Sequence, residues 1–294
     1  MYALIRRKDI ELTPALPDHS HGLTRALLIG AHTGSTHTGL MLVELAGGHV
    51  DTHLHSFESS FYVLSGEPVL YLDGHGVELR PGACGAIPVG VAHAWRAAGA
   101  STWIEMASPR PRTPGTQPSD TFFLGPAPND TPLPLDLRDP RNRNLFLLGE
   151  DDMDLDRLRE GAKVTAPTVS ASMATAALAY SGITVKMLVD KRLDAQLHTM
   201  FMVDYRPGGT ALPHDHPFEE SYYMLGGEID VVADGERHTL HTGDAFWTGV
   251  GCIHAFYELK DGTAMWLETS APGPPDRHAY RFDRDWDYLA DQLD

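Results

Sequence analysis

Three histidines and one glutamate in the last third of the chain have the residue types and the spacing of a metal site. His214 and His216 stand two residues apart, so both imidazoles point to the same side of an extended strand. Glu220 follows after a bend at Pro217, and His254 follows a glycine-rich stretch. Three neutral imidazoles and one carboxylate suit Mn(II), Fe(II), Ni(II), Cu(II) or Zn(II). An octahedral ion with four protein ligands keeps two positions open for substrate or dioxygen.

The first third of the chain contains an incomplete version of the same set. His53, His55 and His93 repeat the histidine spacing, but Ser59 stands where the glutamate would be. Glu58 is adjacent, yet a shift of one residue along a strand turns a side chain to the opposite face. These histidines are a possible second metal site. Loss of the anionic ligand favours a weakly bound, partly occupied or absent metal there over a full site.

Both sets belong to an internal repeat. A shift of 161 positions places residues 47–93 on residues 208–254 without a gap. The matched positions are mostly glycines, histidines and turn residues, including Gly47 on Gly208, Gly66 on Gly227, Asp73 on Asp234, Gly82 on Gly243 and His93 on His254. The chain therefore contains two copies of one module.

Each copy has the pattern of β-structure. The stretches FYVLSGEPVLYLDGHGVEL and SYYMLGGEIDVVADGERHTL contain short apolar runs broken by Gly and Asp-Gly turns. The 28 Gly and 21 Pro residues also favour many short strands over long helices. One short helix is predicted near the end, in DRDWDYLADQL. The predicted fold class is all-β.

A change of composition marks the boundary between the copies. Residues 108–140 are rich in proline and predict an extended crossover, and residues 141–182 predict a connector. We place the boundary near residue 140. The N-terminal domain is then 1–140, including an N-terminal arm, and the C-terminal domain is 141–294.

Composition limits the setting and the partners. The net charge of −17 disfavours nucleic acid and anionic membrane surfaces as partners, because a surface this acidic repels phosphate groups. Two cysteines imply no disulfide framework. The sequence has no apolar run of membrane-spanning length and no signal-peptide pattern at its start, so a cytoplasmic protein is expected.

The metal-ligand motifs resemble those of the cupin superfamily. The spacing of the first signature motif is found at Gly208, His214, His216, Glu220 and Gly227, and that of the second from Gly243 through Gly251 to His254. Gly249 departs from the pattern, which has proline there. The resemblance implies two double-stranded β-helix (jelly-roll) barrels in one chain. It also implies one divalent transition metal ion in the C-terminal barrel, Mn or Fe first, held by the four residues named above.

Strand alternation suggests which residues surround that ion. The predicted substrate pocket is apolar and aromatic, as sites for small molecules commonly are, and consists of Tyr222, Met224, Phe256, Trp266, His198 and Met200. Glu220 is a predicted catalytic residue, and Glu258 or Glu268 is a candidate general acid or base. For each of the last two, exposure at a strand end is the simpler expectation.

Three functions fit this set of residues. The favoured one is a Mn- or Fe-type dioxygenase that acts on a small enolisable or phenolic substrate, by resemblance to quercetinase-like bicupins. The second is a redox-neutral hydrolase, isomerase or decarboxylase. The layout of two modules with a long crossover is similar to the (S)-ureidoglycine aminohydrolase family, although that family's ligand order differs. The third is a cupin that binds a small molecule without catalysis.

We expect the protein to form a homodimer. Barrels of this class are open at one edge, and an exposed sheet edge is commonly covered. Residues 1–36 have no partner inside their own repeat and are free to cover such an edge. Sedimentation at micromolar concentration checks this expectation, and a clean monomer would contradict it.

Overall fold

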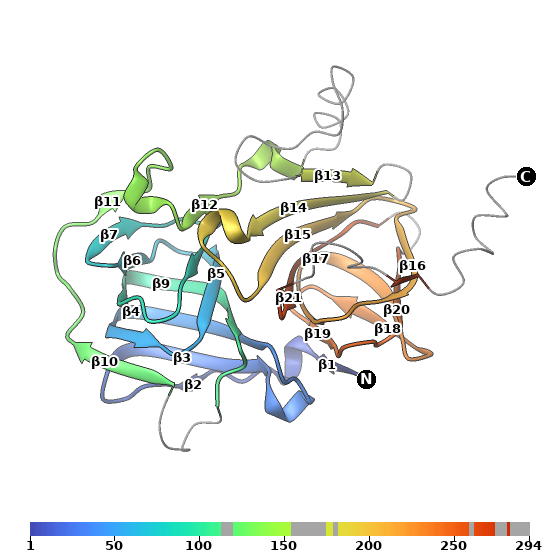
Figure 1. The fold of residues 1–294 in the computed structure, drawn as a ribbon, viewed down its shortest axis with the longest axis horizontal. Helices are drawn as coiled ribbons and strands as arrows, with labels where there is room; N and C mark the ends of the chain where they lie inside the picture. The colour runs from blue at the N-terminus through green and yellow to red at the C-terminus, as the bar shows by residue number, and fades with distance from the viewer. Residues whose placement is uncertain (113–119, 154–174, 179–181, 259–261, 274–280, 283–294) are drawn as a thin grey trace, which may run out of the picture.

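The structure is a computed structural model of residues 1–294. It describes the chain except for residues 113–119, 154–174, 179–181, 259–261, 274–280 and 283–294. Two β-barrels stand side by side, the first coloured blue to green and the second yellow to red (Figure 1). The helix predicted in DRDWDYLADQL lies outside the described residues. No helix of the described part is long and apolar enough to cross a membrane.

Eleven strands form the sheet of the first barrel, in the order β11-β7-β6-β9-β4-β3-β2 with four strands beside this path. The strands are β2 (Thr13–Pro14), β3 (Ser20–Ile29), β4 (Gly39–His55), β5 (Glu58–Ser65), β6 (Val69–Leu72), β7 (His75–Glu78), β8 (Ala83–Ile87), β9 (His93–Ser108), β10 (Thr121–Gly125), β11 (Leu133–Pro134) and β12 (Leu145–Leu147). Strand β10 pairs with β4, β12 with β8, and β5 with both β8 and β9.

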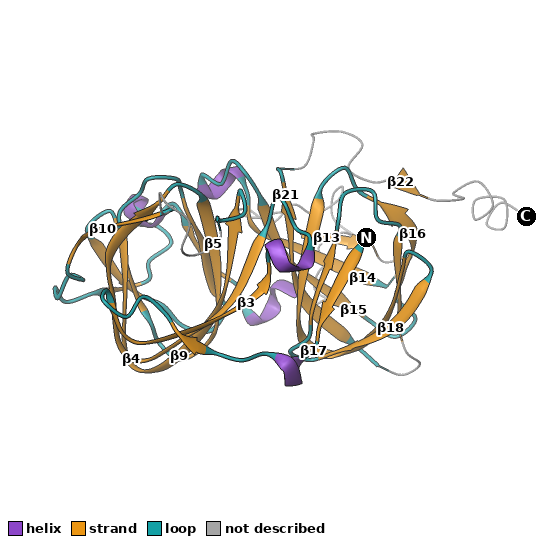
Figure 2. Cartoon of the chain, turned by 90° about the horizontal axis from the view of Figure 1, so that it is seen from below, coloured by secondary structure: helices purple, strands orange, loops and turns teal. Residues whose placement is uncertain are grey.

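The second barrel also has an eleven-stranded sheet, in the order β13-β14-β15-β21-β17-β20-β16-β22. Its strands are β1 (Tyr2–Ile5), β13 (Thr175–Leu178), β14 (Ile183–Val189), β15 (Thr199–Tyr205), β16 (Thr210–Asp215), β17 (Glu219–Ala233), β18 (Glu236–His241), β19 (Ala245–Thr248), β20 (His254–Glu258), β21 (Ala264–Ala271) and β22 (Arg281–Phe282). The helical segments of the described residues are short 3-10 turns: η1 (Arg7–Asp9), η2 (Ala31–Thr33), η3 (Pro140–Asn142), η4 (Glu150–Met153) and η5 (Lys191–Leu193) (Figure 2). The predicted all-β class with two barrels is confirmed.

Each barrel closes because its long strands change partners midway. The first part of β17 pairs with β19 and β21, and the second part pairs with β18 and β20. The change occurs at Gly227, whose φ is +71°. A Cβ at Gly227 would stand 1.7 Å from the backbone oxygen of Thr263, so only glycine fits this close approach of two strands.

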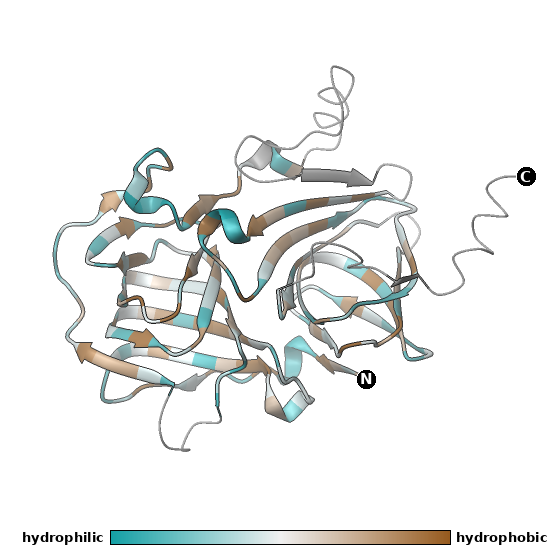
Figure 3. Cartoon of the chain, in the orientation of Figure 1, coloured by the Kyte–Doolittle hydropathy of each residue, from teal (hydrophilic) through white to brown (hydrophobic). Residues whose placement is uncertain are grey.

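Buried apolar side chains form three main clusters. One fills the first barrel and includes Val43 and Trp103, and another fills the second and includes Phe246 and Trp266. The third contains residues from both barrels, such as Leu28 and Met202, and therefore lies between them. Figure 3 shows hydrophobic stretches along β14 and β15, where the barrels meet. Strand β14 contacts β8, and β3 contacts β19.

Each barrel contains one short strand from the segment that precedes the other barrel in the sequence. Strand β1 precedes the first barrel but pairs with β19 of the second, with Tyr2 opposite Thr248. Strand β12 precedes the second barrel but pairs with β8 of the first. The N-terminal arm thus covers an edge within its own chain. Because these short strands cross the predicted boundary at residue 140, the sheets do not divide the chain at one point.

A buried carboxylate of the second barrel holds a turn of the first. Glu219 accepts hydrogen bonds from the backbone N–H groups of Thr36, His37 and Thr38, at 2.8, 3.1 and 3.2 Å, and from the Ser35 hydroxyl at 2.6 Å. Burial alone would raise the pKa of Glu219, but these donors hold it below its usual value.

The repeat produces the reciprocal contact. Glu58, at the matching position of the first barrel, accepts hydrogen bonds from the backbone N–H groups of Gln196 and Leu197 at 2.8 and 2.9 Å. His198 Nδ1 lies 2.9 Å from a Glu58 oxygen. These contacts outweigh the burial that would raise the pKa of Glu58 and leave it lowered. Each barrel therefore holds a turn of the other through one carboxylate.

Glu219→Gln should lower the free energy of unfolding by about 2–4 kcal/mol at pH 7, because it leaves buried donors without their charged acceptor. A group with a lowered folded pKa stabilises above its unfolded pKa, and that contribution is lost as the pH falls through the folded value. The difference should therefore shrink in acid. Urea unfolding of wild type, Glu219→Gln and the exposed control Glu78→Gln across a pH series checks this. Equal stability at pH 7 would contradict it.

Candidate metal centre

The second barrel brings three imidazoles together. His214 lies on β16, His216 directly follows it, and His254 begins β20. One nitrogen from each ring lies within 4.8 Å of the other two. The Nδ1 atoms of His214 and His254 donate to the carbonyl oxygens of Leu212 and Cys252, at 2.6 and 2.9 Å. These bonds fix the ring orientation and make Nε2 the nitrogen that would bind a metal ion.

Glu220 lies beside two of these rings. Its Oε2 atom lies 3.3 Å from the Nε2 atoms of both His216 and His254. Two ligand atoms each about 2.0–2.2 Å from one ion stand about 3.0–3.4 Å apart. Burial lowers the pKa of His214 to about 4 and also lowers that of His254, so both rings are neutral near pH 7. The donor set and its spacing therefore fit a divalent transition metal ion.

A buried network of acids surrounds Glu220. The Tyr222 hydroxyl donates to Glu220 Oε2 at 2.5 Å and lies 3.2 Å from His254 Nε2. Glu268 also hydrogen-bonds Glu220 and accepts from Trp266 Nε1 at 2.9 Å. Burial raises the pKa of Glu220 to about 7 and raises that of Glu268 well above its usual value. Burial and the nearby charge of Glu220 both favour the protonated form of Glu268.

Four predicted pocket residues do lie in the interior of the second barrel. The ring of Phe256 is 5.4 Å from that of Tyr222 and 5.1 Å from that of Trp266, and 5.8 Å from that of His254. Met224 belongs to the same apolar cluster. Glu268 is buried, so the simpler expectation of an exposed carboxylate is wrong for it. The side chain of Glu258 lies outside the described residues.

The structure places the other two predicted pocket residues elsewhere. Met200 belongs to the cluster between the barrels, and His198 contacts Glu58 of the first barrel. The opposite face of β15, with Phe201 and Val203, fills the second barrel instead. Strand alternation separated the two faces correctly. It could not tell which one faces inward, because the contact between barrels buries both.

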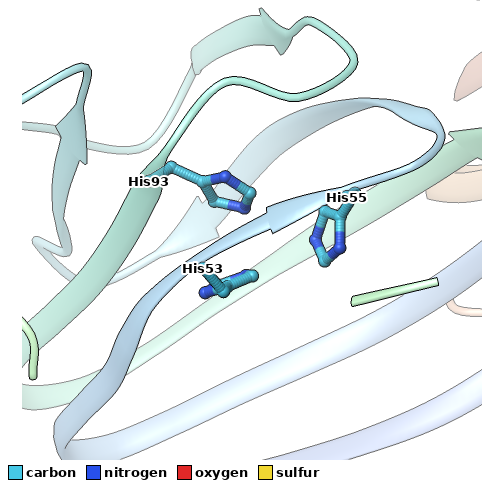
Figure 4. A group of neighbouring side chains, drawn as sticks. All are labelled: His53, His55 and His93. Atoms are coloured by element: carbon cyan, nitrogen blue, oxygen red, sulfur yellow. The ribbon is translucent and has the colours of Figure 1, made fainter. Parts of the chain in front are cut away.

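The first barrel contains the matching three-histidine group (Figure 4). His53 and His93 donate through Nδ1 to the carbonyl oxygens of Asp51 and Val91, and His55 Nδ1 lies 3.0 Å from the Thr121 hydroxyl. The three ligand atoms lie within 4.8 Å of one another. Burial is the main cause that lowers the pKa of His53 to about 4 and that of His93 to about 3.

The ungapped alignment of the two copies does not match one pair of segments that correspond in the structure. Trp266-Leu267-Glu268 matches Trp103-Ile104-Glu105 at a shift of 163, so the ungapped shift of 161 hides it. The strand register shows it directly: Glu268 lies opposite Tyr222 in β17, and Glu105 lies opposite Phe61 in β5. A search for the Trp-x-Glu pattern with a short gap would have found the pair.

Comparison with known proteins identifies the family. Residues 41–106 and residues 201–270 each match the model of the cupin domain. These ranges contain the three-histidine groups of the first and second barrels, respectively. The chain contains two cupin domains.

The individual proteins that resemble this chain share 30% or less of its sequence over the matched residues. The pectin degradation protein KdgF of Dickeya dadantii (strain 3937) is 30% identical over 74 residues, which are 25% of this chain and 66% of that protein. Salicylate 1,2-dioxygenase from Pseudoaminobacter salicylatoxidans superposes with a TM-score of 0.69 at 13% identity, over 92% of this chain and 81% of that one. Oxalate decarboxylase from Lactobacillus farciminis gives a TM-score of 0.64 at 13% identity, over 99% and 93%. At this identity the two structures support the fold alone.

The raised pKa of Glu220 predicts how metal binding depends on pH. Below about pH 7 the metal-free carboxyl holds a proton that a metal ion must displace. The affinity of the second barrel for Mn(II) should therefore rise about tenfold per pH unit toward pH 7 and then level off. Calorimetric titration of a His53→Ala/His55→Ala variant isolates this barrel. The same titration with Glu220→Gln added should give weaker binding and a flatter profile. A flat profile with Glu220 intact would contradict the assignment.

Proposed function

We propose that the protein is a metal-dependent enzyme whose centre is in the second barrel. His214, His216, Glu220 and His254 would hold one divalent ion, Mn or Fe first. The observation that carries this proposal is the Glu220 oxygen 3.3 Å from two imidazole nitrogens, in a group of three buried rings. When bound, such an ion supplies Lewis acidity and, if it is redox-active, a means of engaging dioxygen.

The favoured reaction is dioxygenation of a small enolisable or phenolic substrate. The interior beside the histidines is aromatic and apolar, with Tyr222, Phe256 and Trp266 as its rings. Such side chains would exclude water and offer flat faces to a planar substrate. Salicylate 1,2-dioxygenase, whose structure was determined with gentisate, shares the two-barrel fold. That protein acts on an aromatic compound, which supports the choice of substrate class.

Glu268 supports a second candidate, a redox-neutral reaction driven by proton transfer. Its carboxyl is buried beside Glu220 and its pKa is raised, which favours the protonated form that a general acid needs. Tyr222 provides a further O–H group at the same oxygen. The sequence relative KdgF takes part in pectin degradation, and the fold relative from Lactobacillus farciminis is a decarboxylase. A hydrolase, isomerase or decarboxylase would use Glu268 to protonate its product.

The first test of this proposal measures the metal content of the purified protein. Purified protein should contain about one tightly held divalent ion per chain. His214→Ala/His216→Ala should lose it, whereas His53→Ala/His55→Ala should keep it. Elemental analysis measures both, with circular dichroism as the control for folding. Full retention in the His214→Ala/His216→Ala variant would place the ion elsewhere.

Activity then separates the two reactions. Oxygen consumption with catechol-like, diketone and flavonol substrates would support the dioxygenase, and turnover without oxygen would support the second candidate. Glu220→Gln should abolish turnover of the substrate found, and His53→Ala/His55→Ala should leave it largely intact. If Glu268 is the general acid, Glu268→Gln should lower turnover about 100-fold or more with the metal still bound. A folded but inactive His53→Ala/His55→Ala variant would move the active site to the first barrel.

A further inference from the structure

Arg25 points into the first barrel. It lies directly opposite Val43 in the pairing of β3 with β4, and Val43 lies opposite Trp103 in the pairing of β4 with β9. Side chains that oppose each other on antiparallel strands project to the same face of the sheet. Val43 and Trp103 both belong to the core of the first barrel, so Arg25 shares that interior face.

The positive charge of Arg25 acts on the three-histidine group. Burial is the main cause of the lowered pKa values of His53, His55 and His93, and the positive charge of Arg25 lowers all three further. Among the described residues, no carboxylate forms an ion pair with Arg25. Arginine keeps its charge at any physiological pH.

The same interior contains hydrogen-bond donors that have no acceptor. Arg25 Nε, Trp103 Nε1 and the Ser59 hydroxyl are buried and lack a hydrogen-bond partner within the described part of the chain. A buried donor without an acceptor is costly, and such groups commonly mark a place for a ligand or water. In the second barrel the matching tryptophan, Trp266, donates to Glu268.

The two barrels thus differ in charge at matching positions. The second has Glu220 where the first has Ser59, and in the first barrel Arg25 adds a positive charge beside the histidines. We propose that the first barrel is a second small-molecule site, which binds an organic anion such as a carboxylate between Arg25 and the three-histidine group. The anion accepts from the free donors and supplies the negative charge that Glu220 supplies in the second barrel.

The proposed site also couples the binding of the anion to the binding of a metal ion. A divalent ion held by three neutral imidazoles has no anionic protein ligand, and Arg25 adds further positive charge. A bound carboxylate offsets both charges, so anion and metal should each strengthen the binding of the other in the first barrel, by the same factor. The site is separate from the centre proposed in the second barrel, and either can fail without the other.

Glu105 is a protein carboxylate that would compete with the proposed anion for Arg25. It is buried on the same interior face, two residues after Trp103. Trp103 does not donate to it, and no ion pair joins it to Arg25 among the described residues. If Glu105 nevertheless neutralises Arg25 in solution, wild type will not bind added anions and Glu105→Gln will bind them. That result would overturn the proposal.

The experiment compares ligands that match in shape and differ in charge. Acetate with acetamide, and benzoate with benzamide, are titrated by calorimetry into protein saturated with Mn(II). At least one anion should bind wild type about tenfold or more tightly than its amide. Arg25→Gln should weaken anion binding about 10- to 100-fold and leave amide binding within about twofold. The exposed control Arg138→Gln should behave as wild type.

Two further variants locate the anion. His53→Ala/His55→Ala should weaken anion binding at least about tenfold, and His214→Ala/His216→Ala should leave it within about twofold. The Mn(II) capacity of wild type should rise toward two ions per chain when the anion is present. Absence of anion binding in wild type, unchanged binding in Arg25→Gln, or loss confined to the His214→Ala/His216→Ala variant would each overturn the proposal.

Discussion

The structure depends on two buried carboxylates that hold the barrels together. Glu58 and Glu219 occupy matching positions of the repeat, and each accepts backbone N–H groups from a turn of the other barrel. A charged acceptor buried among several donors is fixed in place, because any displacement leaves those donors unpaired. Each of these residues begins a strand, β5 or β17, whose next residue points the opposite way. Glu220 is thereby directed toward the histidines of its own barrel.

One duplicated module has produced two different electrostatic environments. In the second barrel, Glu220 and Glu268 share a buried hydrogen bond, and burial raises the pKa of both. A metal ion would relieve this cost by favouring the ionised form of Glu220. In the first barrel the corresponding strand position is a serine, and Arg25 lies on the interior face. The geometry that collects three imidazoles is kept in both, and the charge around them is what differs.

The contact between the barrels also determines which face of each shared strand is free for chemistry. Strand β15 has Met200 and Met202 on the face toward the first barrel, and Phe201 and Val203 on the face toward its own interior. Both faces are buried and apolar. The exchanged strands β1 and β12 add to this contact, so neither barrel is an independent unit in the way that the sequence repeat suggests.

The sequence by itself determined the repeat, the all-β class, the two histidine groups and the place of Glu220. These depend on local spacing: two residues for a shared strand face, and glycine where two strands approach closely, as at Gly227. Only the tertiary structure decided that His198 and Met200 lie between the barrels, that Glu268 is buried against Glu220, and that Arg25 lies on the interior face of the first barrel. Each of these depends on which of two buried faces points inward or on contacts between distant strands. The alternation of apolar residues encodes neither the inward face nor the contacts between distant strands. A strand that is covered on both sides has the same pattern whichever way it faces.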